Sequence, residues 1–227
     1  MSAATRLALF DLDNTLLTGD SDVLWVEFLL ARGILDASFA AANADMDRRY
    51  RAGLATAPEF CALYVSTLTH MTREAGEALR LAFHADIIRP RISAAARALV
   101  ESHRAAGDTL VMTTATNRFF TELTAIEFGI DHLIATEVEE IARVFTGKTT
   151  GVLNMREGKV TRLQHWLVAR GEPESLIASA TFYSDSINDL SLLSIVATPV
   201  AVDPDETLRA EAIQRGWNIL TLARDEK

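Results

Sequence analysis

The sequence is nearly devoid of cysteine. Cys61 is the single cysteine among 227 residues, which excludes a disulfide within the chain and a cysteine-based metal cluster. This usage is typical of a reducing cytoplasm, where we expect the protein to act, although a cysteine-poor exported protein would have the same count. Cys61 itself is better interpreted as a small apolar residue on a helix face than as a catalytic thiol.

Positive charge is also scarce. The chain has 22 Lys and Arg residues against 31 Asp and Glu residues, a formal net charge of -9. A surface of this sign repels polyanions, so we expect no nucleic-acid partner. A small phosphate ester remains a possible substrate, because a few locally placed positive groups are enough to bind it.

Long apolar runs are missing as well. No uncharged apolar stretch reaches the roughly 20 residues that cross a bilayer, and the apolar residues before Asp11 are too few for a signal-peptide core. We therefore expect no membrane partner. Hydrophobic residues still make up 49% of the chain and charged residues 23%, which predicts a folded globular protein.

Short apolar runs alternate with helical patterns along most of the chain. Residues 7–10 are wholly apolar and stop at Asp11, as expected of a parallel strand buried on both faces. The other predicted strands are Thr109–Met112, His132–Ala135, Ala180–Tyr183, Val196–Val202 and Asn218–Leu222. The helical patterns between them include Ser93–Ala105, Phe119–Phe128 and Val160–Arg170. This alternation predicts an α/β fold with a doubly wound parallel sheet.

One region breaks the alternation. Residues 21–88 are helical in pattern throughout and lie between the first and second predicted strands. We interpret them as a helical cap inserted after the first strand, with residues 1–18 and 89–227 as the catalytic core and residues 19–88 as the cap. The glycine-containing segment 144–159 predicts a small hairpin.

Carboxylates follow two of the predicted strands, at the sheet edge where α/β proteins bind ligands. Asp11 and Asp13 follow the first strand, and Asp185 and Asp189 follow the run that ends at Tyr183. Each buried anion costs several kcal/mol unless it is compensated, and Mg²⁺ prefers carboxylate oxygens. A solvent-exposed strand end or a helix cap would explain either pair alone.

Two further features complete the set. Thr114, followed by Ala115 and Thr116, stands between a strand and a helix, where a hydroxyl and backbone N–H groups can hold phosphate. Lys159 opens the helix that leads to the Asp185 strand, and there it could neutralise Asp11 and pair with phosphate oxygens. Taken alone, Thr114 is more simply interpreted as an ordinary helix start and Lys159 as a surface lysine. The prediction of a phosphate site therefore rests on the order of all four features: the acid pair, the hydroxyl, the lysine and the second acid pair.

This order resembles the haloacid dehalogenase superfamily of phosphatases. The matching motifs are Asp11-x-Asp13-x-Thr15 and Asp185-x-x-x-Asp189, and the resemblance spans nearly the whole chain. The position of the cap resembles the phosphoserine phosphatase-like branch, and the motif flanks are similar to bacterial histidinol-phosphatases of that branch. Many relatives have Gly in place of Ser184, and phosphoserine phosphatases usually have Ser-Gly-Gly where this chain has Thr114-Ala115-Thr116. The loss of both glycines weakens the phosphoserine assignment more than the phosphatase assignment.

The resemblance implies a Mg²⁺-dependent hydrolase of small phosphate monoesters that passes through an aspartyl-phosphate. It implies that Asp11 is the nucleophile and Asp13 the general acid and base, and that Asp11, the backbone carbonyl of Asp13 and Asp185 hold the metal. The implied phosphate-binding groups are Thr114, the N–H of Ala115, Lys159 and Asn188. Asp189 is implied to orient Lys159 or a metal-bound water.

Acidic residues on the cap side point to the substrate. In phosphoserine phosphatase-like relatives an acidic residue at the place of Asp20 contacts the substrate amine, and Asp22 lies close to it in the chain. We therefore expect an amine-bearing ester, with histidinol phosphate ahead of phosphoserine.

Two other groups in the cap have competing interpretations. Arg48, Arg49 and Arg51 could bind a substrate carboxylate, but a solvated helix face is the simpler explanation for at least two of them. The aromatic residues that could line a pocket are usually core residues at this helical spacing; they are Trp25, Phe28 and Tyr50.

Three rival functions share parts of this pattern. A non-catalytic receiver-like module also places acids at strand ends, but it lacks the cap and the acid at Asp13. A dehalogenase normally dispenses with Mg²⁺, which the acids at Asp13 and Asp185 argue against. A phosphotransferase uses the same residues as a hydrolase and passes the phosphate to an acceptor alcohol, so this alternative stays open.

Overall fold

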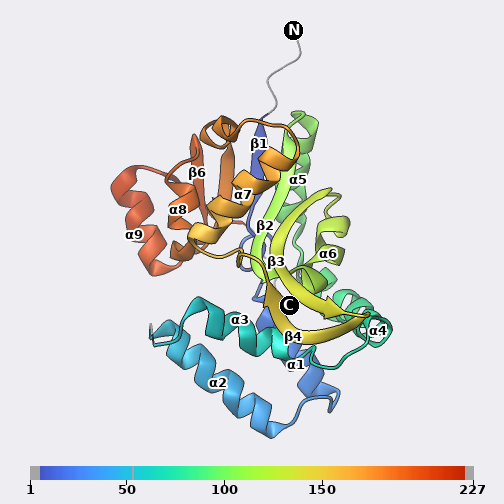
Figure 1. The fold of residues 1–227 in the computed structure, drawn as a ribbon. Coiled ribbons are helices and arrows are strands. Elements are labelled where there is room, and N and C mark those ends of the chain that lie inside the picture. The colour runs from blue at the N-terminus through green and yellow to red at the C-terminus, as the bar shows by residue number, and fades with distance from the viewer. Residues whose placement is uncertain (1–5, 53, 223–227) are drawn as a thin grey trace.

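A seven-stranded sheet forms the centre of the described part of the protein (Figure 1). The computed structural model describes residues 6–52 and 54–222. The strand order is β4-β3-β2-β1-β5-β6-β7, and every neighbouring pair is parallel except β3 and β4. The strands are β1 (Leu7–Phe10), β2 (Thr109–Asn117), β3 (His132–Ile141), β4 (Val144–Thr150), β5 (Thr181–Ser184), β6 (Thr198–Val202) and β7 (Asn218–Leu220). The predicted α/β fold with a mostly parallel sheet is confirmed.

Helices cover both faces of this sheet. They are α5 (Ala94–Ala105), α6 (Arg118–Glu127), α7 (Glu157–Ala169), α8 (Leu190–Leu193) and α9 (Glu206–Arg215), with short helical turns η3 (Glu174–Ser179) and η4 (Ile187–Asp189). Side chains alternate between the faces of a strand, so Ala8 and Phe10 pack in the core cluster that includes residues of α5 and α6, and Leu7 and Leu9 pack in the cluster that includes residues of α7 to α9. This double burial explains why the first strand is continuously apolar.

The described residues from Ser21 to Arg91, between β1 and α5, form helices joined by turns, as predicted. They are α1 (Ser21–Ala31), α2 (Ala37–Arg51), α3 (Ala57–Ser66), α4 (Arg73–Phe83), η1 (His84–Ile88) and η2 (Arg89–Arg91). Figure 1 shows α1, α2 and α3 beyond the end of the sheet at which β1 and β2 finish. Within the described residues, no helix is long and apolar enough to cross a membrane.

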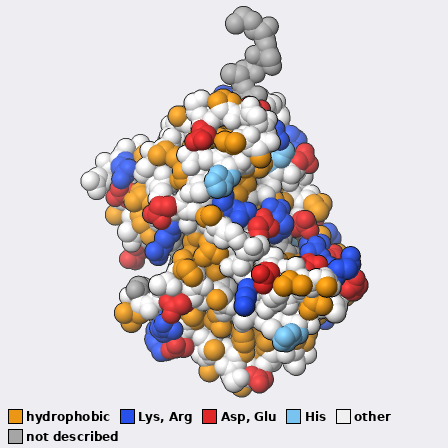
Figure 2. Space-filling model, viewed as in Figure 1, with side chains coloured by type: hydrophobic (Ala, Val, Ile, Leu, Met, Phe, Trp, Pro, Cys, Tyr) orange, Lys and Arg blue, Asp and Glu red, His pale blue; other side chains and the backbone are white. Residues whose placement is uncertain are grey.

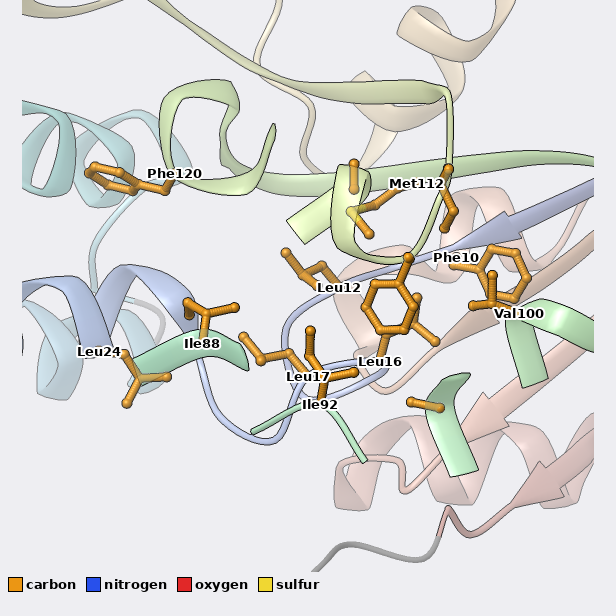
Figure 3. Close-up of a cluster of buried hydrophobic side chains, with 14 of the residues drawn as sticks. Phe10, Leu12, Leu16, Leu17, Leu24, Ile88, Ile92, Val100, Met112 and Phe120 are labelled. Atoms are coloured by element: carbon orange, nitrogen blue, oxygen red, sulfur yellow. The ribbon is translucent and has the colours of Figure 1, made fainter. Parts of the chain in front are cut away.

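The helical segment shares an apolar cluster with the sheet (Figure 3). The cluster runs from Phe10 and Met112 in the strands through Leu17 to Leu24 and Ile88 in the helices. Because residues on both sides of the predicted boundaries at 18 and 88 pack together, the helices are held against the sheet at both of their connections to it. The division into a core and a cap stays a prediction.

Of the three aromatic residues that could line a pocket, two belong to this apolar cluster. Trp25 is fully buried, and its ring centroid lies 4.5 Å from that of Phe120 in α6. Phe28 is 5% exposed and packs against Phe83 of α4. The core interpretation is therefore confirmed for Trp25 and Phe28, while the side chain of Tyr50 lies outside the described part of the protein.

The predicted hairpin was placed too late in the chain. Strands β3 and β4 form it, and it turns at Ala142 and Arg143, which have φ angles of 50° and 64°. Only its second strand falls within residues 144–159. The first strand was predicted only as His132–Ala135, because β3 continues from this apolar start into the half-exposed and exposed residues 137–141, where a search for apolar runs stops.

Candidate active site

The loop after β1 carries the first acid pair. The Leu12 carbonyl accepts N–H groups from Thr15 and from the two leucines that follow it, which coils the chain directly beyond the strand. Gly19 then has φ +110°, a conformation that side-chain-bearing residues rarely adopt, and its carbonyl accepts the Asn14 N–H at 3.0 Å. This tight loop returns the chain to α1 and leaves Asp11 and Asp13 at the end of the sheet.

A cavity of about 140 Å³ lies where these acids meet residues from the neighbouring strands and from α3. The molecular surface is hollowed between α3 and the part of the protein that holds the sheet (Figure 2). Lys159 is the only Lys or Arg among the described residues that line the cavity. The lining aspartates are Asp11, Asp13, Asp20, Asp22, Asp185 and Asp189.

Lys159 compensates two of these acids. It is 2% exposed, and its Nζ donates to Asp11 Oδ1 and to Asp189 Oδ2, both at 2.7 Å. Burial by itself lowers the pKa of Lys159, but the two carboxylates outweigh it and raise the pKa above its ordinary value. The first turn of α7, which carries Lys159, packs closely against the preceding loop. A Cβ on Gly158 would lie 2.0 Å from the Leu153 carbonyl oxygen, so only glycine fits there. The two carboxylates therefore hold the Lys159 ammonium beside Asp11.

Asp11 and Asp185 lie on either side of one hydroxyl. Thr15 Oγ1 is 3.2 Å from Asp11 Oδ2 and 3.0 Å from Asp185 Oδ1, and it accepts the Asp185 backbone N–H. Burial raises the pKa of Asp11 to about 7, although Lys159 opposes this shift. Burial, followed by repulsion from Asp11, raises the pKa of Asp185 to about 8.

These two carboxylates suit a divalent cation. Lys159 carries one positive charge among Asp11, Asp185 and Asp189, so ionisation of all three leaves a surplus of negative charge. In the described residues, no group of three or more His, Cys, Asp or Glu side chains is arranged as metal ligands. A pair of carboxylates supplemented by a backbone carbonyl and water is, however, the kind of donor set that Mg²⁺ uses.

A second group of acids lies around Thr116. Its hydroxyl is 2.8 Å from Asp13 Oδ2 and 3.2 Å from Asp22 Oδ2, and it accepts from the Ser21 hydroxyl at 3.3 Å. Burial, then the nearby charge of Asp20, raises the pKa of Asp13 to about 6. The same two causes raise the pKa of Asp22 well above its ordinary value. The contacts that the structure gives for Asp13 and Asp22 are to hydroxyl and backbone N–H groups rather than to a cation.

Asp20 has a structural task in addition to its place in the cavity. It is the N-cap of α1, and its Oδ1 accepts the backbone N–H groups of Asp22 at 2.9 Å and Val23 at 3.1 Å. Asp20 and Asp22 thus share the cavity wall with different constraints on their carboxylates.

The predicted phosphate-binding residues are mostly brought together. Ala115, Lys159 and Asn188 line the cavity. Thr114 lies behind its wall: the side chain is fully buried, and the hydroxyl accepts the Thr116 N–H at 3.2 Å and lies 3.4 Å from Asp13 Oδ2. The contact of Thr114 with phosphate stays a prediction.

The two described arginines of the α2 cluster pair with acids that do not line the cavity. Arg48 pairs with Asp45, and Arg49 pairs with Glu59 at 3.2 Å. Neither is among the residues that line the cavity. The side chain of Arg51 lies outside the described part of the protein.

Three hydroxyl residues were missed as site residues. Thr15 and Thr116 join pairs of acids, and Ser184 donates to Asp189 Oδ2 at 2.7 Å. The sequence marked each of these positions: Thr15 belongs to the first motif, and Thr116 and Ser184 stand where relatives have glycine. The extra hydroxyl groups supply donors to buried carboxylates that glycine could not supply.

The sequence profile of the haloacid dehalogenase-like hydrolases matches residues 8–194. This chain belongs to that family. It is 39% identical over 217 residues to the histidinol-phosphatase of Neisseria meningitidis, covering 95% of this chain and 98% of that protein. It is 30% identical over 227 residues to a phosphoserine phosphatase of Mycobacterium tuberculosis, covering 95% and 70% of the two chains. The predicted family and its phosphatase class are confirmed.

Solved structures agree with the assignment to the haloacid dehalogenase-like hydrolases. A protein of unknown function from Bordetella pertussis superimposes with a TM-score of 0.91 at 40% identity, covering 96% of this chain and 99% of that one. A substrate-bound phosphoserine phosphatase superimposes with a TM-score of 0.71 at 15% identity, covering 99% and 96%. At 15% identity, the second likeness shows a shared fold and nothing finer.

Proposed function

We propose that this haloacid dehalogenase-like hydrolase is a Mg²⁺-dependent phosphomonoesterase that uses Asp11 as its nucleophile and prefers histidinol phosphate. The observation that carries the proposal is the contact of Lys159 with Asp11 in a cavity otherwise lined by acids. A phosphate brought to this site needs positive charge, which Lys159 and a divalent cation together supply.

The first step is attack of an Asp11 carboxylate oxygen on phosphorus, which forms the aspartyl-phosphate as the bond from phosphorus to the ester oxygen breaks. Asp13 donates its proton to the leaving alkoxide. Its pKa of about 6 suits this transfer, since an effective general acid has a pKa near the working pH. Asp13 then takes a proton from water, which attacks phosphorus, releases inorganic phosphate and restores Asp11.

Other residues prepare the site for these steps. Asp11, the backbone carbonyl of Asp13 and Asp185 would hold Mg²⁺, which when bound reduces the repulsion between phosphate and Asp11. Lys159, Asn188 and the N–H of Ala115 orient the phosphate oxygens, with Thr114 as a further candidate. Asp189 holds Lys159 in place through the 2.7 Å contact.

The leaving group is best matched by a cation without a carboxylate. Asp20 and Asp22 line the cavity, and Lys159, its only described cation, is bonded to Asp11 and Asp189. The described arginines Arg48 and Arg49 do not line the cavity. Phe60 and Met155 add apolar surface against which an imidazole ring can pack. The similarity to the Neisseria histidinol-phosphatase supports the same substrate, while the Mycobacterium relative makes phosphoserine the alternative.

The test is release of inorganic phosphate from L-histidinol phosphate and from L-phosphoserine by the purified protein with Mg²⁺, and again after chelation. We expect a higher kcat/KM for L-histidinol phosphate and no turnover without a divalent ion. A preference for L-phosphoserine would refute the proposed substrate but not the proposed phosphatase activity. Full activity after exhaustive chelation would refute the metal role.

A further inference from the structure

Asp22 is a poorly compensated acid in the cavity wall. It is 7% exposed, and its Oδ1 has no hydrogen-bond partner among the described residues. Its Oδ2 shares the single Thr116 hydroxyl proton with Asp13, which lies closer to that hydroxyl. A buried carboxylate with so few donors is costly, so the position favours a ligand that brings positive charge.

The neighbouring acid is constrained differently. Asp20 Oδ1 already accepts two N–H groups at the start of α1, and turning this oxygen toward a ligand would uncap the helix. The carboxylate of Asp22 has no such duty. Rotation about its terminal torsion, which is soft, can turn either oxygen toward the cavity that Asp22 lines.

The place of Asp22 also limits what the ligand can be. Thr116 touches both Asp22 and Asp13, so Asp22 lies one hydroxyl group away from the acid that protonates the leaving oxygen. A cation bound there must be close to the ester oxygen along the substrate. In the phosphate ester of a vicinal amino alcohol, the ammonium is on the carbon next to the ester carbon, which satisfies this condition.

We propose that Asp22, positioned by Thr116, binds the substrate ammonium and makes the enzyme selective for phosphate esters of vicinal amino alcohols. This inference rests on the proposed phosphatase function. It assigns the amine to Asp22, and to Asp20 only the capping of α1 and a contribution to the negative field.

The experiment compares L-histidinol phosphate with 3-(imidazol-4-yl)propyl phosphate, which lacks only the amine. In the wild-type protein, kcat/KM should favour the amine-bearing ester. Asp22→Asn should lower this preference by about 10–100-fold, the loss expected for a hydrogen bond to a charged group. Asp20→Asn keeps a capping side chain and should lower the preference less. Glu27→Gln, an exposed acid on the same helix, is the matched control and should not change it.

Binding provides a readout that does not depend on turnover. L-histidinol, titrated into the Mg²⁺-loaded protein by calorimetry, should bind more weakly to Asp22→Asn by the same factor, and Thr116→Ser should retain affinity that Thr116→Val loses. An equal loss for both esters, or a larger loss in Asp20→Asn than in Asp22→Asn, would overturn the inference. If L-histidinol binds as expected but no ester is hydrolysed, the phosphatase proposal fails and the assignment of Asp22 stands.

Discussion

The two sides of the cavity handle negative charge differently. On the side that we propose to bind the metal (the metal side), Lys159 bonds to Asp11 and Asp189 at 2.7 Å, and Asp185 completes the group. On the side that we propose to receive the leaving group (the leaving-group side), Asp13 and Asp22 share the Thr116 hydroxyl, without a described cation in contact.

This difference separates two kinds of ligand. The metal side already holds one fixed cation, so one divalent ion would balance its remaining charge and admit a phosphate. The leaving-group side has only hydroxyl and N–H donors, and an organic cation would balance it. Four experiments, ordered from the largest expected effect to the smallest, test whether the two sides of the cavity act separately.

The largest effect is expected on the metal side. Asp11→Asn should abolish turnover because an amide cannot form the aspartyl-phosphate. Labelled phosphate from the substrate should be trapped on the wild-type protein at Asp11 and should not appear on the variant. The exposed Asp131→Asn variant is a control for folding and handling. Label found on Thr114 or Ser184 would overturn the assignment.

A smaller loss is expected at the boundary between the sides. Asp13→Asn removes the proposed proton donor, and proton transfer of this kind typically contributes about 10²–10⁴-fold. The loss in kcat/KM, which reports the steps up to formation of the aspartyl-phosphate, should be large with L-histidinol phosphate and smaller with p-nitrophenyl phosphate, whose leaving group needs little protonation. Equal losses with both esters would show that Asp13 acts chiefly by holding the metal or the loop.

The surplus of negative charge among the buried carboxylates should also make the free energy of unfolding depend on pH. The unfolded chain releases carboxyl protons near pH 4, whereas burial raises the pKa values of Asp13, Asp11 and Asp185 to about 6, 7 and 8 in the folded state. The folded state therefore binds more protons across this range, and stability of the metal-free protein should fall as the pH rises from about 4 to about 8.

Thermal unfolding in chelator at pH 5 and pH 8 measures this loss. Added Mg²⁺ should raise Tm more at pH 8, because the carboxylates that are proposed to hold it are then ionised. An equal Mg²⁺ effect at both values would contradict the proposed ligands.

The smallest effects should distinguish the two acids of the leaving-group side. Asp22→Asn removes an uncompensated buried charge and should raise the free energy of unfolding at pH 8 by about 1 kcal/mol. Asp20→Ala removes the N-cap of α1 and should lower it by about 1 kcal/mol. Urea unfolding of the metal-free variants provides both values, and a loss of stability in Asp22→Asn would indicate that its carboxylate is structural.

The order of elements and motifs was readable in the sequence. Each buried strand is a local apolar run, and the acids that follow β1 and β5 converge because carboxyl ends of parallel strands share one edge of the sheet. Lys159 was expected beside Asp11 because of its place in the order of the four features, since the local pattern by itself favoured a surface lysine.

The partners of individual side chains were decided by the tertiary structure. The sequence gives Asp20 and Asp22 the same chemistry, but the start of α1 takes Asp20 as its cap and turns Asp22 to Thr116, a residue 94 positions away. Likewise, β3 continues past its apolar start because β4 pairs with its exposed half. Apolar burial and strand direction are local properties of a chain, whereas the compensation of a buried charge depends on groups that only folding brings within hydrogen-bonding distance.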